Sequence, residues 1–226
     1  MQKLVIAIDG PSAAGKSTVG KMLAKKLNYI YIDTGAMYRA IALKLQRNDI
    51  SLDDLSNIEN ILKHSTINFI RKNDELRIIL DGEDVSPEIR TPLISKMASD
   101  ASAVPIVRTC LVKMQQEMGE AGGVVMDGRD IGTVVFPGAE CKFFLDASLD
   151  ERARRRFKEL QEQGLAVEFS QVRREMEQRD HNDSTRAHSP LRKAVDAISI
   201  DTTDLELEAV IQKMWDLIIS RYGIRI

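Results

Sequence analysis

The chain has 226 residues, of which 43% are hydrophobic and 29% are charged, as expected of one globular domain or of one domain with an inserted sub-domain. Its 13 glycines and 6 prolines exclude a collagen-like or low-complexity protein. The net charge of −2 argues against a uniformly basic nucleic-acid scaffold, and the two cysteines, Cys110 and Cys141, are too few for a disulfide framework.

Strand-like and helix-like stretches alternate along the chain. The apolar run at residues 4–8 predicts a buried strand, and the amphipathic stretch that ends at residue 27 predicts a helix. We expect further strands at 29–32, 124–126, 142–145 and 197–200, and further helices at 36–48, 92–121, 149–163, 170–183 and 205–222. This alternation predicts an α/β fold built on a parallel sheet.

Three short strand-like stretches, at 67–71, 76–80 and 83–85, interrupt the alternation and predict a small antiparallel insert. The apolar run at 4–8 is too short for the apolar core of a signal peptide, and no stretch approaches the roughly 18 apolar residues of a membrane span. We therefore expect a soluble, cytoplasmic protein with no membrane partner.

A glycine-bearing loop lies between the first strand and the first helix. It fits the P-loop pattern G-x-x-x-x-G-K-S/T with Gly10, Pro11, Ser12, Ala13, Ala14, Gly15, Lys16 and Ser17, followed by Thr18. Backbone N–H groups of such a loop converge on phosphate oxygens, and the following helix adds its positive end. Lys16 is placed to reach the β- and γ-phosphates of a nucleotide, and the Ser17 hydroxyl to ligate Mg²⁺. A chance match is the alternative, and the strand–loop–helix context disfavours it.

P-loops occur in kinases, GTPase switches and ATPase motors. The guanine-reading Asn-Lys-x-Asp signature is absent from this sequence, and 226 residues leave little room for the machinery of a motor. A small kinase is favoured, and it needs a pocket for the phosphoryl acceptor.

Candidate acceptor residues follow two of the predicted strands. Thr34 and Arg39 come after the second strand, where Arg39 is either a ligand for a monoester phosphate or a solvated helix residue. Asp127, Arg129 and Asp130 follow the strand at 124–126. They form either part of an acceptor site at the sheet edge or a structural salt bridge.

Two arginine-rich stretches lie further along the chain. The first contains Arg152, Arg154, Arg155 and Arg156, and the second contains Arg179, Asp183 and Arg186. The first stretch is a lid over the transferred phosphoryl group, a solvated helix face or a nucleic-acid patch, and the lack of interleaved aromatic residues disfavours the last. Asp183 is either a ribose ligand or a charge on a helix surface.

Seven segments together resemble the bacterial cytidylate kinases, a family of nucleoside monophosphate kinases. They are IAIDGPSAAGKST, DTGAMYRAIA, DGEDVSPEIRT, PIVRTCL, MDGRDIGTVVFPGAECKFFLDAS, ERARRR and RDHNDSTRAHSPL. The resemblance implies a P-loop kinase core with a five-stranded parallel sheet flanked by helices. It places this core at 1–33, 113–148 and 185–226, a sub-domain that binds the monophosphate at about 34–112 with its antiparallel insert at about 63–91, and a helical lid at about 149–184.

The resemblance also implies transfer of the γ-phosphate of ATP, with Mg²⁺, to CMP or dCMP. Residues 10–18 would hold ATP, and Ser17 would hold the metal. The residues expected at CMP are Thr34, Arg39, Ser99, Arg108, Asp127, Arg129, Asp130, Arg179, Asp183 and Arg186. Lys16, Arg154 and Arg155 would stabilise the transferred group, whereas Arg152 and Arg156 would only decorate the lid helix.

The chemistry of cytosine agrees with these residue types. Its N4 amine suits the carboxylate of Asp130, and its acceptors suit an arginine. UMP would set a carbonyl against that carboxylate, at a cost on the order of a few kcal/mol. The acceptor is already an oxyanion, so we expect no general base and no covalent phosphoenzyme.

Three rival interpretations stay open from the residues. They are a P-loop kinase for UMP, AMP or another phosphorylated metabolite, a nucleotide switch that hydrolyses ATP slowly, and a nucleic-acid-binding protein that uses the arginines of 152–156. We expect a monomer whose partners are the small molecules ATP and CMP or dCMP, without nucleic acid.

Overall fold

The computed structural model describes residues 3–72 and 75–222. The chain forms two compact units, one made of Met1–Tyr31 with Gly119–Ile226 and the other of Ile32–Met118. The second unit contains the range 34–112 that was expected to form a separate sub-domain, and residues 149–184 fall within the first unit.

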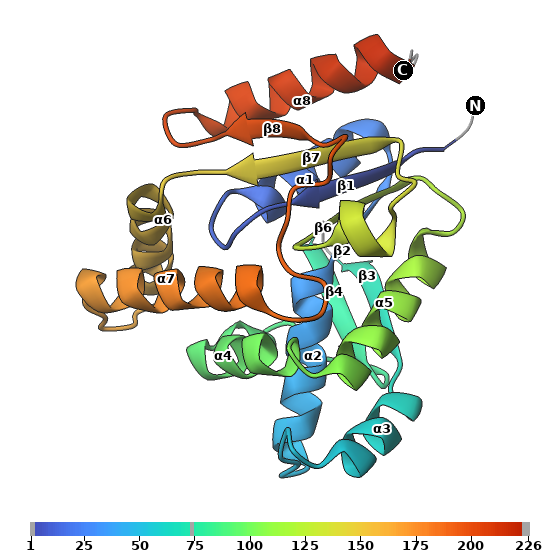
Figure 1. Ribbon diagram of the computed structural model, residues 1–226, viewed down its shortest axis with the longest axis vertical. Helices are drawn as coiled ribbons and strands as arrows, with labels where there is room; N and C mark the ends of the chain where they lie inside the picture. Colours follow the sequence, from blue (N-terminus) through green and yellow to red (C-terminus); the bar gives the residue numbers. More distant parts are fainter. Residues whose placement is uncertain (1–2, 73–74, 223–226) are drawn as a thin grey trace. The chain divides into compact units, whose positions relative to one another are not determined.

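The first unit is built on a five-stranded sheet with the order β2-β6-β1-β7-β8 (Figure 1). The strands are β1 (Val5–Asp9), β2 (Ile30–Asp33), β6 (Val124–Gly128), β7 (Cys141–Asp146) and β8 (Ile198–Asp201), of which β2 ends in the second unit. β1 pairs in parallel with β6 and β7, and β7 pairs in parallel with β8. Ile6, Ala7 and Ile8 are fully buried, as expected of a strand that is covered on both faces. The predicted parallel α/β sheet is confirmed.

Helices α1 (Lys16–Leu27) and α8 (Leu207–Tyr222) pack against each other. Helix α6 (Leu149–Glu162) begins just beyond the carboxyl end of β7 and packs on α7 (Phe169–Thr185) (Figure 1). These two helices bury a small core of their own, which consists of Ala153, Leu160, Val172 and Met176. The rings of Phe157 and Phe169 add an edge-to-face contact with 5.8 Å between centroids.

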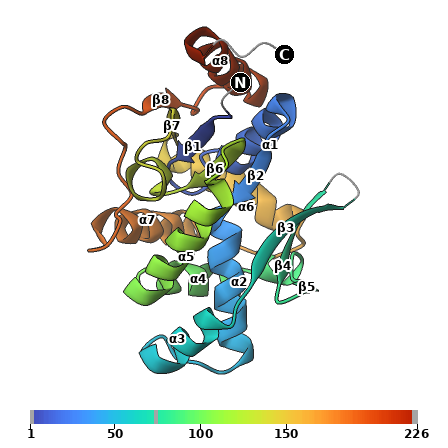
Figure 2. The ribbon, with the colours of Figure 1, turned by 90° about the vertical axis from the view of Figure 1, so that its right-hand side faces the viewer.

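The second unit centres on α2 (Thr34–Arg47), which packs against α3 (Leu55–Lys63) and α4 (Pro92–Ala101). It also contains the short 3-10 helix η1 (Glu88–Arg90) and most of α5 (Pro105–Gly119). The predicted antiparallel insert is a three-stranded sheet of β3 (Ile67–Lys72), β4 (Glu75–Leu80) and β5 (Glu83–Asp84) (Figure 2). Three ion pairs join α2 to the segment that runs from the end of β4 through β5 to η1, namely Lys44–Asp81, Arg47–Glu83 and Arg47–Glu88.

Two sequence-based assignments of helices need correction. The helix predicted at 92–121 is two helices, because Pro105 begins α5 at the first helical position, where its missing N–H costs nothing. No helix was predicted at Leu55–Lys63, although Asp54 caps it by accepting a 3.1 Å hydrogen bond from the Asn57 backbone N–H. Its buried Ile58 and Leu62 have the four-residue spacing of a helix face.

Within residues 3–72 and 75–222, no helix combines the length and the apolar character of a membrane span.

Candidate active site

The P-loop connects β1 to α1 through backbone that favours glycine. Gly10, Ala13 and Gly15 have φ angles of 146°, 60° and 90°. A Cβ atom on Gly10 would lie 1.9 Å from the carbonyl oxygen of Leu145, so only glycine fits this close approach to β7. Alternation between ordinary and left-handed backbone curls a chain into the concave form that gathers N–H groups around an anion. The loop therefore has the shape that phosphate binding requires.

Lys16, the first residue of α1, is almost completely buried, with 5% of its surface exposed. Its Nζ donates a 2.5 Å hydrogen bond to the carbonyl oxygen of Pro11, which spans the loop. Burial lowers the pKa of Lys16 to about 7, and the positive charge of Arg129 acts in the same direction, while Asp127 and Asp9 oppose the shift. An anion bound beside Lys16 would restore its ordinary affinity for a proton.

Ser17 and Asp127 bring two oxygen groups together beside the P-loop. The Ser17 hydroxyl donates to Oδ2 of Asp127 at 2.8 Å, and the Tyr31 hydroxyl donates to Oδ1 at 2.8 Å. The Asp127 carboxylate is buried, with 4% exposed. Asp127 was predicted at the acceptor, and the structure places it against the P-loop serine. A hydroxyl and a carboxylate are the hard oxygen ligands that Mg²⁺ prefers, with water and phosphate completing its shell.

This donor set fits a magnesium ion that arrives with a nucleotide. Among the described residues, no group of three or more His, Cys, Asp or Glu side chains is arranged to hold a metal alone. Mg²⁺ commonly uses one or two protein ligands together with substrate phosphates, and Ser17 with Asp127 would be able to supply them.

A second cluster joins residues that are far apart in the sequence. Arg129 Nε donates to Asp183 Oδ2 at 2.8 Å, and Arg186 lies 3.4 Å from the other Asp183 oxygen and 3.9 Å from Asp130 Oδ1. Asp183 is 5% exposed, so the alternative of a helix-surface charge is wrong. Burial raises the pKa of Asp183, but Arg129, Arg179 and Arg186 together outweigh it and hold that pKa below its ordinary value. The cluster is a buried arrangement of fixed charges, suited to reading a polar ligand.

The other predicted acceptor residues lie in the second unit. Thr34 is the buried first residue of α2, and Arg39 on the same helix pairs with Asp33 at 3.2 Å. Arg108 on α5 is buried over the Tyr38 ring, 5.3 Å from its centroid. Ser99 is half-buried on α4. The second unit therefore contains four of the residues predicted at the acceptor, namely two arginines, the hydroxyl of Thr34 on α2 and the hydroxyl of Ser99 on α4.

The four arginines of α6 have different surroundings. Arg154 pairs with Glu151 and keeps 65% of its side chain exposed, and Arg156 pairs with Glu159. Arg155 also bonds Glu151, and it donates to the Thr202 hydroxyl at 3.1 Å and to the Thr202 carbonyl at 2.6 Å.

Arg152 does not decorate the helix surface, in contrast to the expectation from the sequence. Its side chain is buried, pairs with Asp180 at 2.6 Å and donates to the carbonyl oxygens of Ala147 at 2.9 Å and Ser12 at 3.3 Å. It therefore ties α6 and α7 to the P-loop.

Residues 6–220 match the family model described as cytidylate kinase. The chain belongs to the cytidylate kinase family. It is 54% identical over 213 residues to the cytidylate kinase of Caldanaerobacter subterraneus subsp. tengcongensis, which covers 94% of this chain and 93% of the relative. It is 49% identical over 220 residues to the cytidylate kinase of Syntrophotalea carbinolica, and this match covers 97% of this chain and 94% of the relative. The resemblance proposed from the sequence motifs is confirmed.

Solved structures show the same fold at lower identity. A shikimate kinase from Bacteroides thetaiotaomicron is 17% identical, with a TM-score of 0.50 over 95% of this chain and 98% of that one. This likeness concerns the fold alone, and it agrees with the P-loop kinase core expected of a cytidylate kinase.

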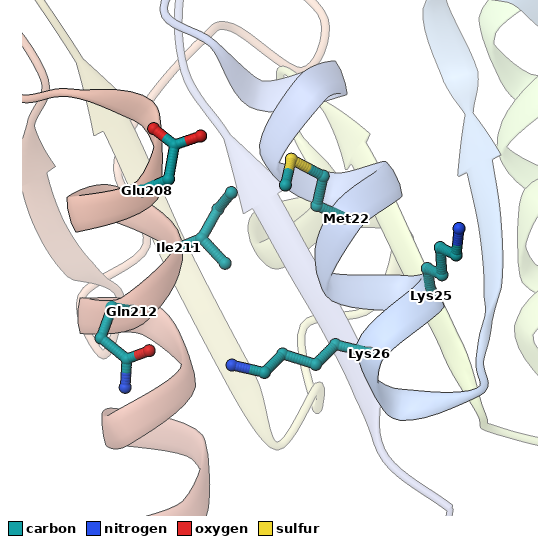
Figure 3. A pocket seen from close by; sticks show the side chains of 6 residues that line it. All are labelled: Met22, Lys25, Lys26, Glu208, Ile211 and Gln212. Carbon is teal, nitrogen blue, oxygen red and sulfur yellow. The ribbon is translucent and has the colours of Figure 1, made fainter.

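A groove of about 470 Å³ lies between α1 and α8 (Figure 3). It is lined by Met22, Lys25, Lys26, Glu208, Ile211 and Gln212. The α1 side chains come from the carboxyl half of the helix, whereas the P-loop leads into its first residue, Lys16. The groove is therefore not the nucleotide site.

Asp9 is a functional candidate to which no role was assigned from the sequence. It ends β1 and accepts hydrogen bonds from the backbone N–H groups of Ile131 at 2.8 Å and Gly132 at 2.7 Å. Burial raises its pKa to about 6, although these two hydrogen bonds oppose the rise. Asp9 thereby fixes the start of the π-helix η2 (Ile131–Val135), next to Asp130. Its place at the carboxyl end of a strand, directly before the P-loop, was the available signal.

Proposed function

We propose that this chain transfers the γ-phosphate of ATP to CMP or dCMP and releases ADP with CDP or dCDP. The observation that carries the proposal is the pairing of two sites in the first unit. One is the P-loop with its buried Lys16, and the other is the charged cluster of Arg129, Asp130, Asp183 and Arg186. Relatives named cytidylate kinase over nearly the whole chain support CMP as the acceptor.

The P-loop side is proposed to hold ATP through residues 10–18. Mg²⁺, when bound with ATP, neutralises charge on the phosphate oxygens, and Ser17 with Asp127 would hold it. Lys16 would place its ammonium against the transferred group, where the low exposure of the site strengthens the attraction. The CMP phosphate is itself the nucleophile, so transfer needs positioning and charge stabilisation rather than a general base.

The charged cluster is proposed to read cytosine and ribose. The Asp130 carboxylate would accept from the N4 amine of cytosine, and the Arg186 guanidinium would donate to an acceptor of the base. Asp183, held ionised by Arg129, Arg179 and Arg186, would accept from a ribose hydroxyl. UMP would set a carbonyl against Asp130 and leave a buried carboxylate without its donor.

Further residues are proposed to hold the phosphate of CMP. Arginine guanidinium groups bind phosphate in a bidentate manner, and the candidates are Thr34, Arg39 and Arg108. Ser99 and Arg179 are proposed to contact the cytosine and ribose instead. Residues 149–184, which form α6 and α7 with their own small core, are proposed to act as a lid that excludes water. Arg154, whose side chain is 65% exposed, is the lid arginine proposed to contact the transferred group.

We further propose a cytoplasmic monomer without a nucleic-acid partner. Arg152, Arg155 and Arg156 all engage partners within their own unit. This leaves the α6 arginines poorly disposed to serve as a basic surface for nucleic acid.

Rates of ADP release with ATP–Mg²⁺ and a panel of CMP, dCMP, UMP, AMP and GMP test the function. We expect fast turnover with CMP and dCMP, slow turnover with UMP and negligible turnover with the purine nucleotides. Equal rates with UMP and CMP would overturn the proposed recognition of cytosine by the charged cluster, but not the proposed kinase activity. ADP release that is unaffected by every monophosphate would favour a nucleotide switch.

A further inference from the structure

A buried threonine behind the P-loop connects this loop to α6. Thr202 directly follows β8 and has 3% of its surface exposed. Its hydroxyl oxygen lies 3.3 Å from the carbonyl oxygen of Ala14 in the P-loop and 3.0 Å from that of Asp146. The single hydroxyl proton is shared between these two acceptors.

Arg155 holds this threonine from the side of α6. Its Nη1 donates to the Thr202 hydroxyl at 3.1 Å and its Nη2 to the Thr202 carbonyl at 2.6 Å. Glu151 fixes the guanidinium by accepting from Nε at 3.0 Å. Because Arg155 donates to the hydroxyl oxygen, the hydroxyl must turn its own proton toward the carbonyl acceptors.

The carbonyl of Ala14 belongs to the same planar peptide group as the N–H of Gly15, and the two point in opposite directions. A hydroxyl that holds the Ala14 oxygen on the outer side of the loop therefore directs the Gly15 N–H toward the inner side, where phosphate binds. Gly15 has a φ angle of 90°, and apart from Gly15 itself and its neighbours along the chain no atom lies within 4 Å of the position that a Cβ would occupy on it. Its own packing therefore does little to prevent this peptide from rotating.

We propose that Thr202 is a positioning residue of the P-loop, which fixes the Ala14–Gly15 peptide for phosphate binding, and that Arg155 acts through Thr202. The proposal rests on ATP occupying the P-loop, as in the proposed function. It gives Arg155 a role behind the loop in place of the direct contact with the phosphoryl group that was predicted from the sequence.

Two substitutions of Thr202 separate its hydroxyl from its volume. Thr202→Val removes the hydroxyl at nearly constant size, and Thr202→Ser retains it. Thr203→Val is the matched control, because it removes the neighbouring hydroxyl, which donates to Asp201 at 2.6 Å and accepts from the backbone N–H of Ser148 at 2.9 Å. The readouts are the equilibrium Kd for ATP–Mg²⁺, the KM for ATP and for CMP, and kcat.

We expect Thr202→Val to raise the Kd and KM for ATP about tenfold, as for the loss of one positioned hydrogen bond. The KM for CMP should change less than about twofold, and Thr202→Ser and Thr203→Val should stay within about twofold of the wild type. Arg155→Met should also weaken ATP binding. Combining it with Thr202→Val should raise the Kd for ATP little further, because both substitutions act on the same peptide group.

An unchanged Kd for ATP in Thr202→Val would overturn the proposal, as would a serine variant as weak as the valine variant. A large fall in kcat for Arg155→Met with the Kd for ATP unchanged would return Arg155 to direct catalysis. If Thr202→Val does not fold, Thr202→Ser and Arg155→Met still decide between these outcomes. ADP release by the wild type reports separately on the proposed function, because the Kd ratio needs no acceptor.

Discussion

The Ser17 hydroxyl donates a hydrogen bond of 2.8 Å to Oδ2 of Asp127, which is 110 positions away in the sequence. β1 and β6 are neighbouring parallel strands, with Ile8 opposite Asp127, so the carboxyl ends of both strands lie at one edge of the sheet. Asp127 thus reaches the first turn of the helix that follows the P-loop. The same oxygen atoms form the magnesium site proposed above.

Asp127→Asn tests that site. The amide keeps the volume of the side chain but loses its negative charge, so Mg²⁺ should bind more weakly and kcat should fall by about 10²-fold. A magnesium titration of the rate measures both effects. Tyr31→Phe, which removes the hydrogen bond to the other carboxylate oxygen and keeps the charge, is the control and should cost less than about tenfold. An Asp127→Asn enzyme with the magnesium dependence of the wild type would contradict the assignment.

Lys16 predicts a pH dependence of ATP affinity. Its pKa lies near 7 in the folded protein, and bound phosphate should raise it, so above pH 7 ATP binding must take up a proton. The affinity for ATP should therefore fall as pH rises above 7, by up to about tenfold per pH unit. Isothermal titration in buffers of different ionisation enthalpy counts the protons taken up.

The comparison for this effect is Lys16→Arg, whose side chain stays charged throughout this range. It should lose the fall in affinity above pH 7, whatever its absolute affinity. Identical pH profiles of ATP affinity for the wild type and Lys16→Arg would refute the role of burial in lowering the pKa of Lys16.

Lys16 also affects the stability of the fold. Its folded pKa lies below the ordinary value of 10.5, so its contribution to the free energy of unfolding should increase as pH rises from about 7 to 10.5.

Asp130→Asn should relax the choice of base. The amide offers both a donor and an acceptor, so kcat/KM for CMP should fall by about 10- to 100-fold, while the ratio of UMP to CMP turnover should rise. Competition between the two monophosphates at fixed ATP measures the ratio. A uniform loss with both substrates would assign Asp130 to structure, through its contact with Arg186.

Gly10→Ala tests the close approach of the P-loop to β7. Its Cβ would meet the Leu145 carbonyl oxygen at 1.9 Å, and the positive φ there disfavours any other residue. We expect a loss of on the order of 3 kcal/mol or more in the free energy of unfolding by urea. Gly138→Ala, where a Cβ meets open space, should change it by less than about 1 kcal/mol. Equal free energies of unfolding for the two variants would show that the loop backbone shifts to accommodate a Cβ at residue 10, and would contradict the requirement for glycine there.

The sequence allowed prediction of those features that depend on local patterns. The apolar run of β1, the P-loop and the strands of the insert each have short-range signals, and all three lie where they were expected. The break between α4 and α5 at Pro105 had a local signal that the long helix prediction overlooked.

The features that were missed depend on contacts between distant residues. The burial of Arg152 depends on Asp180 and on the Ser12 carbonyl, and the association of Asp127 with Ser17 depends on strand order. Neither has a spacing that can be read along the chain. The role of Asp9 likewise depends on two N–H groups more than 120 residues away.

The most direct test of the proposed reaction follows the γ-phosphate itself. ATP labelled at the γ-position is incubated with CMP and Mg²⁺, and the products are separated for the wild type and for Lys16→Ala. We expect the label in CDP, at a rate that falls by orders of magnitude in Lys16→Ala while the fold is retained. Label that appears only as inorganic phosphate, or a Lys16→Ala variant as active as the wild type, would contradict phosphoryl transfer through this P-loop.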